Sequence, residues 1–90
     1  MIEKEIVIKN RAGLHTRPAA SLVKMAAKFK SEFFIMKDGL EINGKSIIGV
    51  MTLAAEHGST LTLRFEGDDE ASMAVAICGL IEAGFEESLK

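Results

Sequence analysis

The chain has 90 residues, of which 48% are hydrophobic, and its 11 basic and 13 acidic side chains give a formal net charge of -2. This length predicts a single domain over residues 1–90. The near balance of charge excludes a general polyanion-binding protein, and the lack of Tyr and Trp argues against nucleic-acid binding on an exposed sheet.

The sequence shows no targeting or membrane segment. Its first residues lack the apolar run that follows the basic start of a signal peptide, and no apolar run approaches the roughly 18 residues that span a bilayer. Cys78 is the single cysteine, so the chain can form no intramolecular disulfide, and the apolar neighbours of Cys78 predict a buried thiol. We expect a cytoplasmic monomer that needs no metal or cofactor and does not insert into a membrane.

The first two predicted elements are a strand and a helix. Ile2, Ile6 and Ile8 alternate with charged or outward-facing residues and predict a strand that ends near Asn10. From Pro18 the apolar spacing becomes helical, since proline is tolerated in a first helical turn. The predicted core-facing residues of this helix are Ala19, Leu22, Val23, Ala26 and Phe29.

The rest of the chain supplies three strands and two helices. Residues 32–37 are rich in β-formers, and Asp38-Gly39 predicts a hairpin turn into a short strand over residues 40–42. A helix is predicted over residues 47–55 and a fourth strand over residues 61–65. Acidic residues open a last helix, which ends near Gly84. The predicted core-facing residues of this last helix are Ala74, Ile77, Cys78 and Ile81.

The predicted order is therefore βαββαβα. Four strands whose helices must all cover the same face make an α+β open-faced sandwich.

The reactive chemistry is concentrated in residues 13–20, Gly-Leu-His-Thr-Arg-Pro-Ala-Ala. His15 lies where a helix begins, so it faces backbone N–H groups and the positive end of the helix dipole. That field disfavours the imidazolium form and keeps a neutral, nucleophilic nitrogen available. Arg17 and the same N–H groups can receive the oxygens of a phosphoryl group on His15. Gly13 permits a tight turn before the histidine, and Thr16 is a candidate helix cap.

A second group of candidate residues surrounds Ser46, a favoured N-cap for the helix predicted over residues 47–55. This helix is apolar nearly all round, so it is either wholly buried or partly exposed and covered by a partner. Ser46 is either a cap alone or a regulatory phosphorylation site. A phosphoserine would add about -1.5 to -2 charges, which a helix start accepts but an acidic partner repels. The apolar residues expected at the surface are Ile47, Ile48 and Met51.

These two groups together resemble the HPr family, the phosphocarriers of the bacterial phosphotransferase system, and the resemblance covers the whole chain. It implies an antiparallel sheet and a carrier protein that is not itself an enzyme. It also implies that enzyme I phosphorylates His15 on Nδ1, that Arg17 assists, and that IIA domains of sugar permeases receive the group. Ser46 matches the target of HPr kinase/phosphorylase, which acts in catabolite control together with a transcriptional regulator. The implied docking residues are Thr16, Arg17, Ala20, Lys24, Ile47, Ile48 and Met51.

The branch of the family stays open. Residues 83–87 are similar to the nitrogen-branch paralogue NPr, whereas Lys45-Ser46-Ile47 resembles HPr proteins that are kinase substrates. The alternative to sugar transport is therefore a mainly regulatory phosphoprotein that docks partners according to its phosphorylation state. The sequence has no second acid/base group, metal-ligand spacing or Gly-rich phosphate loop that would indicate an autonomous enzyme.

Overall fold

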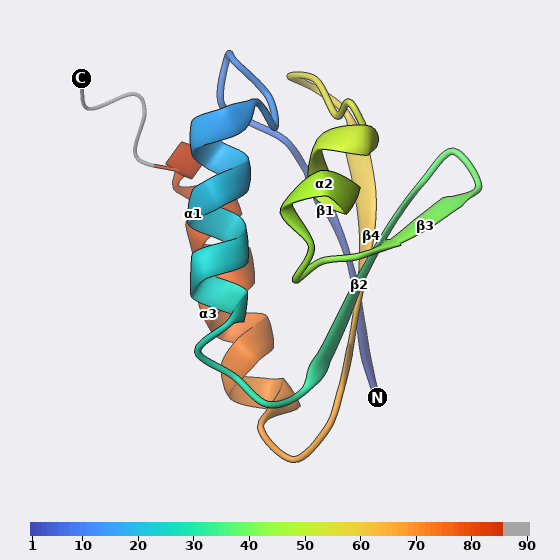
Figure 1. Cartoon of the computed structure of the whole chain (residues 1–90), viewed down its shortest axis with the longest axis vertical. Coiled ribbons are helices and arrows are strands. Elements are labelled where there is room, and N and C mark those ends of the chain that lie inside the picture. The colour runs from blue at the N-terminus through green and yellow to red at the C-terminus, as the bar shows by residue number, and fades with distance from the viewer. Residues whose placement is uncertain (86–90) are drawn as a thin grey trace.

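The computed structural model describes residues 1–85, which form one four-stranded sheet with helices on a single face (Figure 1). This arrangement confirms the predicted α+β open-faced sandwich. The elements in chain order are β1 (Ile2–Val7), α1 (Thr16–Ala26), β2 (Glu32–Lys37), β3 (Leu40–Asn43), α2 (Ile47–Thr52), β4 (Thr60–Glu66) and α3 (Glu70–Glu82).

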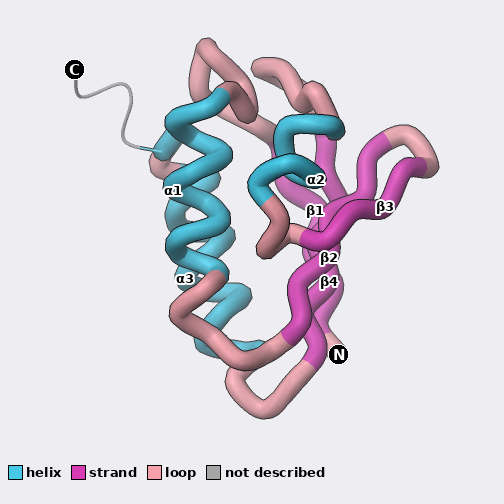
Figure 2. Tube along the Cα trace, viewed as in Figure 1, coloured by secondary structure: helices cyan, strands magenta, loops and turns pink. Residues whose placement is uncertain are grey.

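The strands are antiparallel neighbours in the order β1-β4-β2-β3. Although β4 comes last in sequence, it lies between β1 and β2 and pairs with both. Ile6 lies opposite Leu61 and Ile35 lies opposite Leu63, so the alternating apolar residues of neighbouring strands share one face. Figure 2 shows the helices on one side of the strands, and the core lies between these two layers.

Aromatic stacking is a central feature of the core. The rings of Phe33 and Phe65 stack with centroids 4.9 Å apart and an interplanar angle of 1°. Such a pair contributes about 0.5–1.5 kcal/mol beyond its buried area. Gly44 lies directly against the Phe33 ring, and a Cβ at this position would overlap the ring atoms. The residue after β3 therefore has to be glycine for the aromatic pair to fit.

The first strand and helix differ from the prediction at their ends. β1 ends at Val7, before the predicted limit near Asn10, because the chain beyond Ile8 leaves the sheet to form the turn before α1. α1 ends at Ala26, because the N–H groups of Lys28 and Phe29 bond to carbonyls three residues back, a tightened turn that does not continue the helix. Phe29 still packs against the core beyond this turn.

The second helix is shorter than predicted. It ends at Thr52, well before residue 55, because Ala54 has a φ of 52°. This left-handed conformation is incompatible with continuing a right-handed helix. Val50 and Leu53 are buried, so α2 packs on the core through one side only. The predicted strand over residues 40–42 extends to Asn43.

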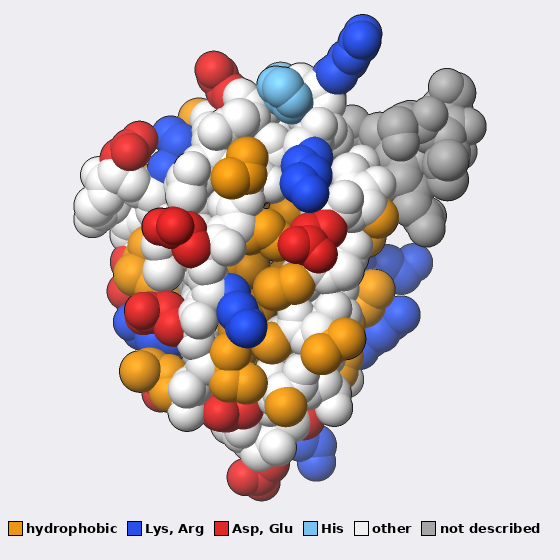
Figure 3. Space-filling model, turned by 180° about the vertical axis from the view of Figure 1, so that it is seen from behind, with side chains coloured by type: hydrophobic (Ala, Val, Ile, Leu, Met, Phe, Trp, Pro, Cys, Tyr) orange, Lys and Arg blue, Asp and Glu red, His pale blue; other side chains and the backbone are white. Residues whose placement is uncertain are grey.

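The prediction of a buried Cys78 thiol is wrong, because this side chain is only partly buried, although it still packs against the core. Met73, which was not predicted to face inward, is fully buried. Partial burial and the nearby Glu82 raise the pKa of the Cys78 thiol, while Lys4 opposes this shift, so the group stays protonated near neutral pH. α3 has no charged residue between its two ends, and Val75 is 75% exposed. Seen from behind, hydrophobic side chains accordingly gather across the middle of the molecule (Figure 3).

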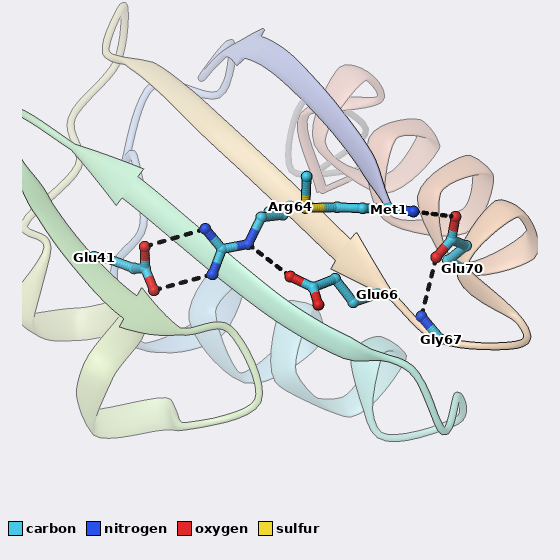
Figure 4. Close-up of polar contacts among 6 residues, drawn as sticks. All are labelled: Met1, Glu41, Arg64, Glu66, Gly67 and Glu70. Atoms are coloured by element: carbon cyan, nitrogen blue, oxygen red, sulfur yellow. Dashed lines mark hydrogen bonds and ion pairs between the residues drawn. The ribbon is translucent and has the colours of Figure 1, made fainter.

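The sheet face away from the helices is acidic. Its central cation is Arg64 in β4, which lies 4.7 Å from the centroid of the Phe34 ring. Arg64 pairs with Glu41 at 3.2 Å and with Glu66 at 3.1 Å (Figure 4). Pairs as exposed as these contribute about 1 kcal/mol or less each. The strand register places the following glutamates on this face: Glu3, Glu5, Glu32, Glu41 and Glu66.

Residues 86–90 lie outside the described structure, and with them Glu86 and Glu87 of the tail that is similar to NPr. Within residues 1–85, no helix combines the length and apolarity needed to cross a membrane. The same residues contain no group of three or more His, Cys, Asp or Glu side chains placed to hold a metal ion.

Candidate functional site

His15 is exposed and immediately precedes α1. Its backbone is extended, with φ -80° and ψ -171°, and its carbonyl accepts a hydrogen bond from Ala19 N–H at 2.9 Å. His15 is therefore the N-cap residue of α1, but its side chain makes no capping hydrogen bond. The imidazole is not used to hold the helix start and is open to solvent.

The first turn of α1 offers backbone donors. Thr16 and Arg17 occupy the first helical positions, where an N–H group has no acceptor within the helix. Pro18 has no N–H, and the N–H of Ala19 already bonds to the His15 carbonyl. The turn contains no acidic residue, and the helix dipole stabilises an anion here by about 0.3–1 kcal/mol. The prediction that Thr16 caps the helix is wrong, because the cap position falls one residue earlier.

The turn before His15 is held against the chain that follows α2. Gly13 has a φ of 68°, and a Cβ at this position would lie 2.5 Å from the Ala55 carbonyl oxygen. Leu14 N–H donates to that oxygen at 2.8 Å. Figure 1 accordingly shows the loop before α1 and the loop before β4 at the same end of the molecule. Glycine is required here both for its positive φ and for the close approach.

Asn10, which was not among the predicted site residues, also holds this turn. Its side-chain Nδ2 donates to the Gly13 carbonyl at 2.8 Å. An asparagine that closes a strand and precedes a turn glycine is typical of side-chain-to-backbone turn bonds, so this signal was present in the sequence.

The start of α2 has a side-chain cap, which confirms the structural part of the Ser46 prediction. Ser46 Oγ accepts a hydrogen bond from Gly49 N–H at 3.1 Å. Lys45 Nζ donates to the Phe29 carbonyl at 2.7 Å, just beyond the end of α1. α2 is therefore tied to the neighbouring helix as well as to the core.

α1 and α2 pack against each other, so the predicted docking residues of both helices lie on neighbouring elements (Figure 1). Ile47, Ile48 and Met51 are 36%, 75% and 43% exposed, which confirms that this helix is not wholly buried. All four predicted docking residues of α1 are exposed as well. We call this set the α1–α2 surface: Thr16, Arg17, Ala20, Lys24, Ile47, Ile48 and Met51.

The protein family described as the PTS HPr component phosphorylation site matches residues 2–83. The chain belongs to the HPr family. It is 49% identical to the HPr-like protein Crh of Halalkalibacterium halodurans, over 91% of this chain and 98% of that protein. It is 45% identical to the phosphocarrier protein HPr of Treponema pallidum, over 97% of this chain and 99% of that protein.

Solved structures of the HPr family share the fold. HPr-C-His of Thermoanaerobacter tengcongensis superimposes with a TM-score of 0.94 at 46% identity, covering 97% of this chain and 98% of that chain. An HPr dimer from the same organism gives a TM-score of 0.76 at 46% identity, covering 94% of this chain and 98% of that chain. Membership of this family makes the chain a phosphocarrier-type protein and not an enzyme in itself.

Proposed function

We propose that this HPr-family chain works in the cytoplasm as a carrier that accepts a phosphoryl group on His15 from phosphorylated enzyme I. It then passes the group to a IIA domain of a sugar permease. The observation that supports this role most strongly is the start of α1, where an exposed imidazole precedes backbone donors in a turn without acidic side chains. This arrangement favours an anionic group attached to the histidine.

The transfer exchanges one bond to phosphorus for another. The lone pair of His15 Nδ1 attacks the phosphorus, and the bond that joins phosphorus to enzyme I breaks as the new P–N bond forms. Arg17 and the N–H groups of Thr16 and Arg17 receive the phosphoryl oxygens. Because the helix-dipole contribution is only about 0.3–1 kcal/mol, it does not prevent onward transfer to the next partner.

The α1–α2 surface is the proposed dock for enzyme I and for IIA domains. Full burial of an aliphatic side chain such as Ile48 contributes about 1.5–3 kcal/mol, so a partner that covers the exposed apolar residues gains affinity. Arg17 and Lys24 add positive charge to this surface, whereas the outer sheet face carries five glutamates. This asymmetry favours an acidic partner on the α1–α2 surface.

Phosphorylation by enzyme I with labelled phosphoenolpyruvate tests the carrier role. The wild-type chain is expected to acquire an acid-labile, base-stable label, and His15→Ala is expected to acquire none. His57→Ala is the matched control, because His57 is also exposed but lies in the loop before β4. Equal labelling of wild type and His15→Ala would overturn the proposal.

The second candidate is a mainly regulatory phosphoprotein, of either the catabolite-control or the NPr-like nitrogen branch. The position of Ser46 favours it, since this residue starts the helix that carries the exposed apolar residues of the α1–α2 surface. HPr kinase/phosphorylase would add the phosphoryl group to Ser46, and a transcriptional regulator would bind the product. Ser46→Asp should then change the affinity for enzyme I, a IIA domain or the regulator, as measured by calorimetry. Unchanged affinity for all of them would exclude this role.

We further propose that the active form is a monomer, because each partner needs free access to the α1–α2 surface. Light scattering at micromolar concentration tests this proposal, and a stable dimer under those conditions would contradict it.

A further inference from the structure

Asn10 is a buried polar residue next to the turn that carries His15. Its relative exposure is 5%. The chain after α3 contributes to this burial, since a Cβ at Gly84 would lie 3.8 Å from Asn10 Cβ. Burial of an amide is unfavourable unless the group is hydrogen-bonded. An amide at this position therefore needs a role that an apolar residue would not fill.

The Asn10 amide helps to hold a single peptide group from both ends. Nδ2 of Asn10 donates to the Gly13 carbonyl at 2.8 Å, and the N–H at the other end of that peptide, on Leu14, donates to the Ala55 carbonyl at 2.8 Å. The Gly13 N–H also donates to the backbone carbonyl of Asn10 at 3.2 Å. The orientation of the Gly13–Leu14 peptide is thus set by two partners from different parts of the chain.

We propose that Asn10 is a positioning residue, which holds His15 in place for phosphoryl transfer by holding the Gly13–Leu14 peptide. The inference rests on the proposed carrier function. Glycine can adopt many backbone conformations, so Gly13 by itself does not fix the direction in which the chain leads into His15. The Asn10 bond selects one direction, in which His15 leads directly into the N–H donors of the first turn of α1. Asn10 itself does not touch the phosphoryl group.

Asn10→Ala separates positioning from docking, because the α1–α2 surface is left unchanged. This chain is the substrate in the enzyme I reaction. We expect the KM of enzyme I for the chain to remain within about twofold and kcat to fall by about 10- to 100-fold, since small misplacements of reacting atoms have effects of this size. We also expect amide and imidazole NMR signals of residues 13–15 to shift. Should Asn10→Ala not fold, Asn10→Ser makes the same test with a shorter side chain.

Ile81→Val is the matched control, because it removes one buried methyl group from the core side of α3 and removes no polar group. We expect this variant to lower the melting temperature but to leave kcat and the signals of residues 13–15 as in wild type. If folded Asn10→Ala is phosphorylated with the wild-type kcat, this inference fails but the carrier function stands. The same conclusion follows if Ile81→Val loses as much kcat as Asn10→Ala. If the wild-type chain accepts no label from enzyme I, the carrier function fails, and this inference fails with it.

Discussion

The starts of α1 and α3 provide the same kind of backbone donors and the same dipole field, but they differ in the charges that lie beside them. At α3, two acidic residues occupy the helix start and are engaged within the fold. At α1, the first turn contains no acidic residue. The N-cap side chains of both helices make no capping hydrogen bond, so the difference lies in the charges beside each helix start. The positive end of α3 therefore lies beside carboxylates that bond elsewhere in the fold, whereas the positive end of α1 is left open to a ligand.

The engagement at α3 is extensive. Asp69 accepts hydrogen bonds from Lys30 N–H and Ser31 N–H at 2.9 Å and from the Ser31 hydroxyl, which ties the start of α3 to the chain before β2. Glu70 accepts from Gly67 N–H at 3.0 Å and pairs with the Met1 amine at 3.0 Å (Figure 4). These bonds, the one from Gly67 first, hold the pKa of Glu70 below its usual value. The acidic residues at the start of α3 stabilise the fold, whereas the start of α1 is free to serve the proposed function.

Placing an acidic residue in the first turn of α1 should have the largest effect. Thr16→Asp brings a carboxylate to the site proposed for the phosphoryl oxygens, so we expect the rate of phosphorylation by enzyme I to fall at least about tenfold. The unfolding free energy should stay the same or rise by about 0.3–1 kcal/mol, because the helix dipole favours the new charge. Ser72→Asp adds the same charge to the first turn of α3 and should leave phosphorylation unchanged. Equal phosphorylation rates for Thr16→Asp and Ser72→Asp would show that the start of α1 is no more sensitive to negative charge than the start of α3.

Removing the Asp69 charge should lower the stability of the fold without changing phosphorylation, which is the reverse of the result expected for Thr16→Asp. The hydrogen bond from the Ser31 hydroxyl and then that from Lys30 N–H lower the pKa of Asp69 to about 2, from a model-compound value of 3.8. Asp69→Asn should therefore lower the melting temperature by several degrees and leave the phosphorylation rate unchanged. Asp68→Asn, at an exposed neighbouring position, controls for the loss of charge.

The hydrogen bonds to Asp69 also predict how stability depends on pH. A carboxyl whose pKa is lower in the folded chain stabilises it above the unfolded pKa, and this stabilisation is lost as the pH falls. The difference in melting temperature between wild type and Asp69→Asn should therefore shrink as the pH falls from about 4 towards about 2. A difference that stays constant over this range would show that the Asp69 charge does not stabilise the fold.

The smallest effect is expected at α2, whose start is capped by a neutral side chain. Ser46→Ala removes the acceptor of Gly49 N–H and should lower the unfolding free energy by about 1 kcal/mol, as measured by urea denaturation. Ser72→Ala, at an exposed serine of α3, is the control and should change this free energy little. An unchanged unfolding free energy in Ser46→Ala would mean that water replaces the serine hydroxyl as the acceptor of the Gly49 N–H.

Local patterns were sufficient to predict most of the elements and the position of His15 at the start of α1. The alternation of Ile2, Ile6 and Ile8 and the helical spacing after Pro18 follow directly from strand and helix geometry. Element ends were less predictable, because they depend on single backbone conformations. The positive φ of Ala54 that ends α2 is an example, since alanine carries no signal for a left-handed turn.

The sequence by itself determined that His15 starts a helix whose first turn lacks acidic residues, because these properties belong to adjacent residues. Only the tertiary structure decided what surrounds that helix start. The bond from Leu14 to Ala55, the packing of α1 on α2 and the contact of Asp69 with Ser31 each join residues far apart in the chain. No local periodicity encodes such pairings. They arise when the apolar faces of sheet and helices are buried together, which brings the polar groups at their ends into reach.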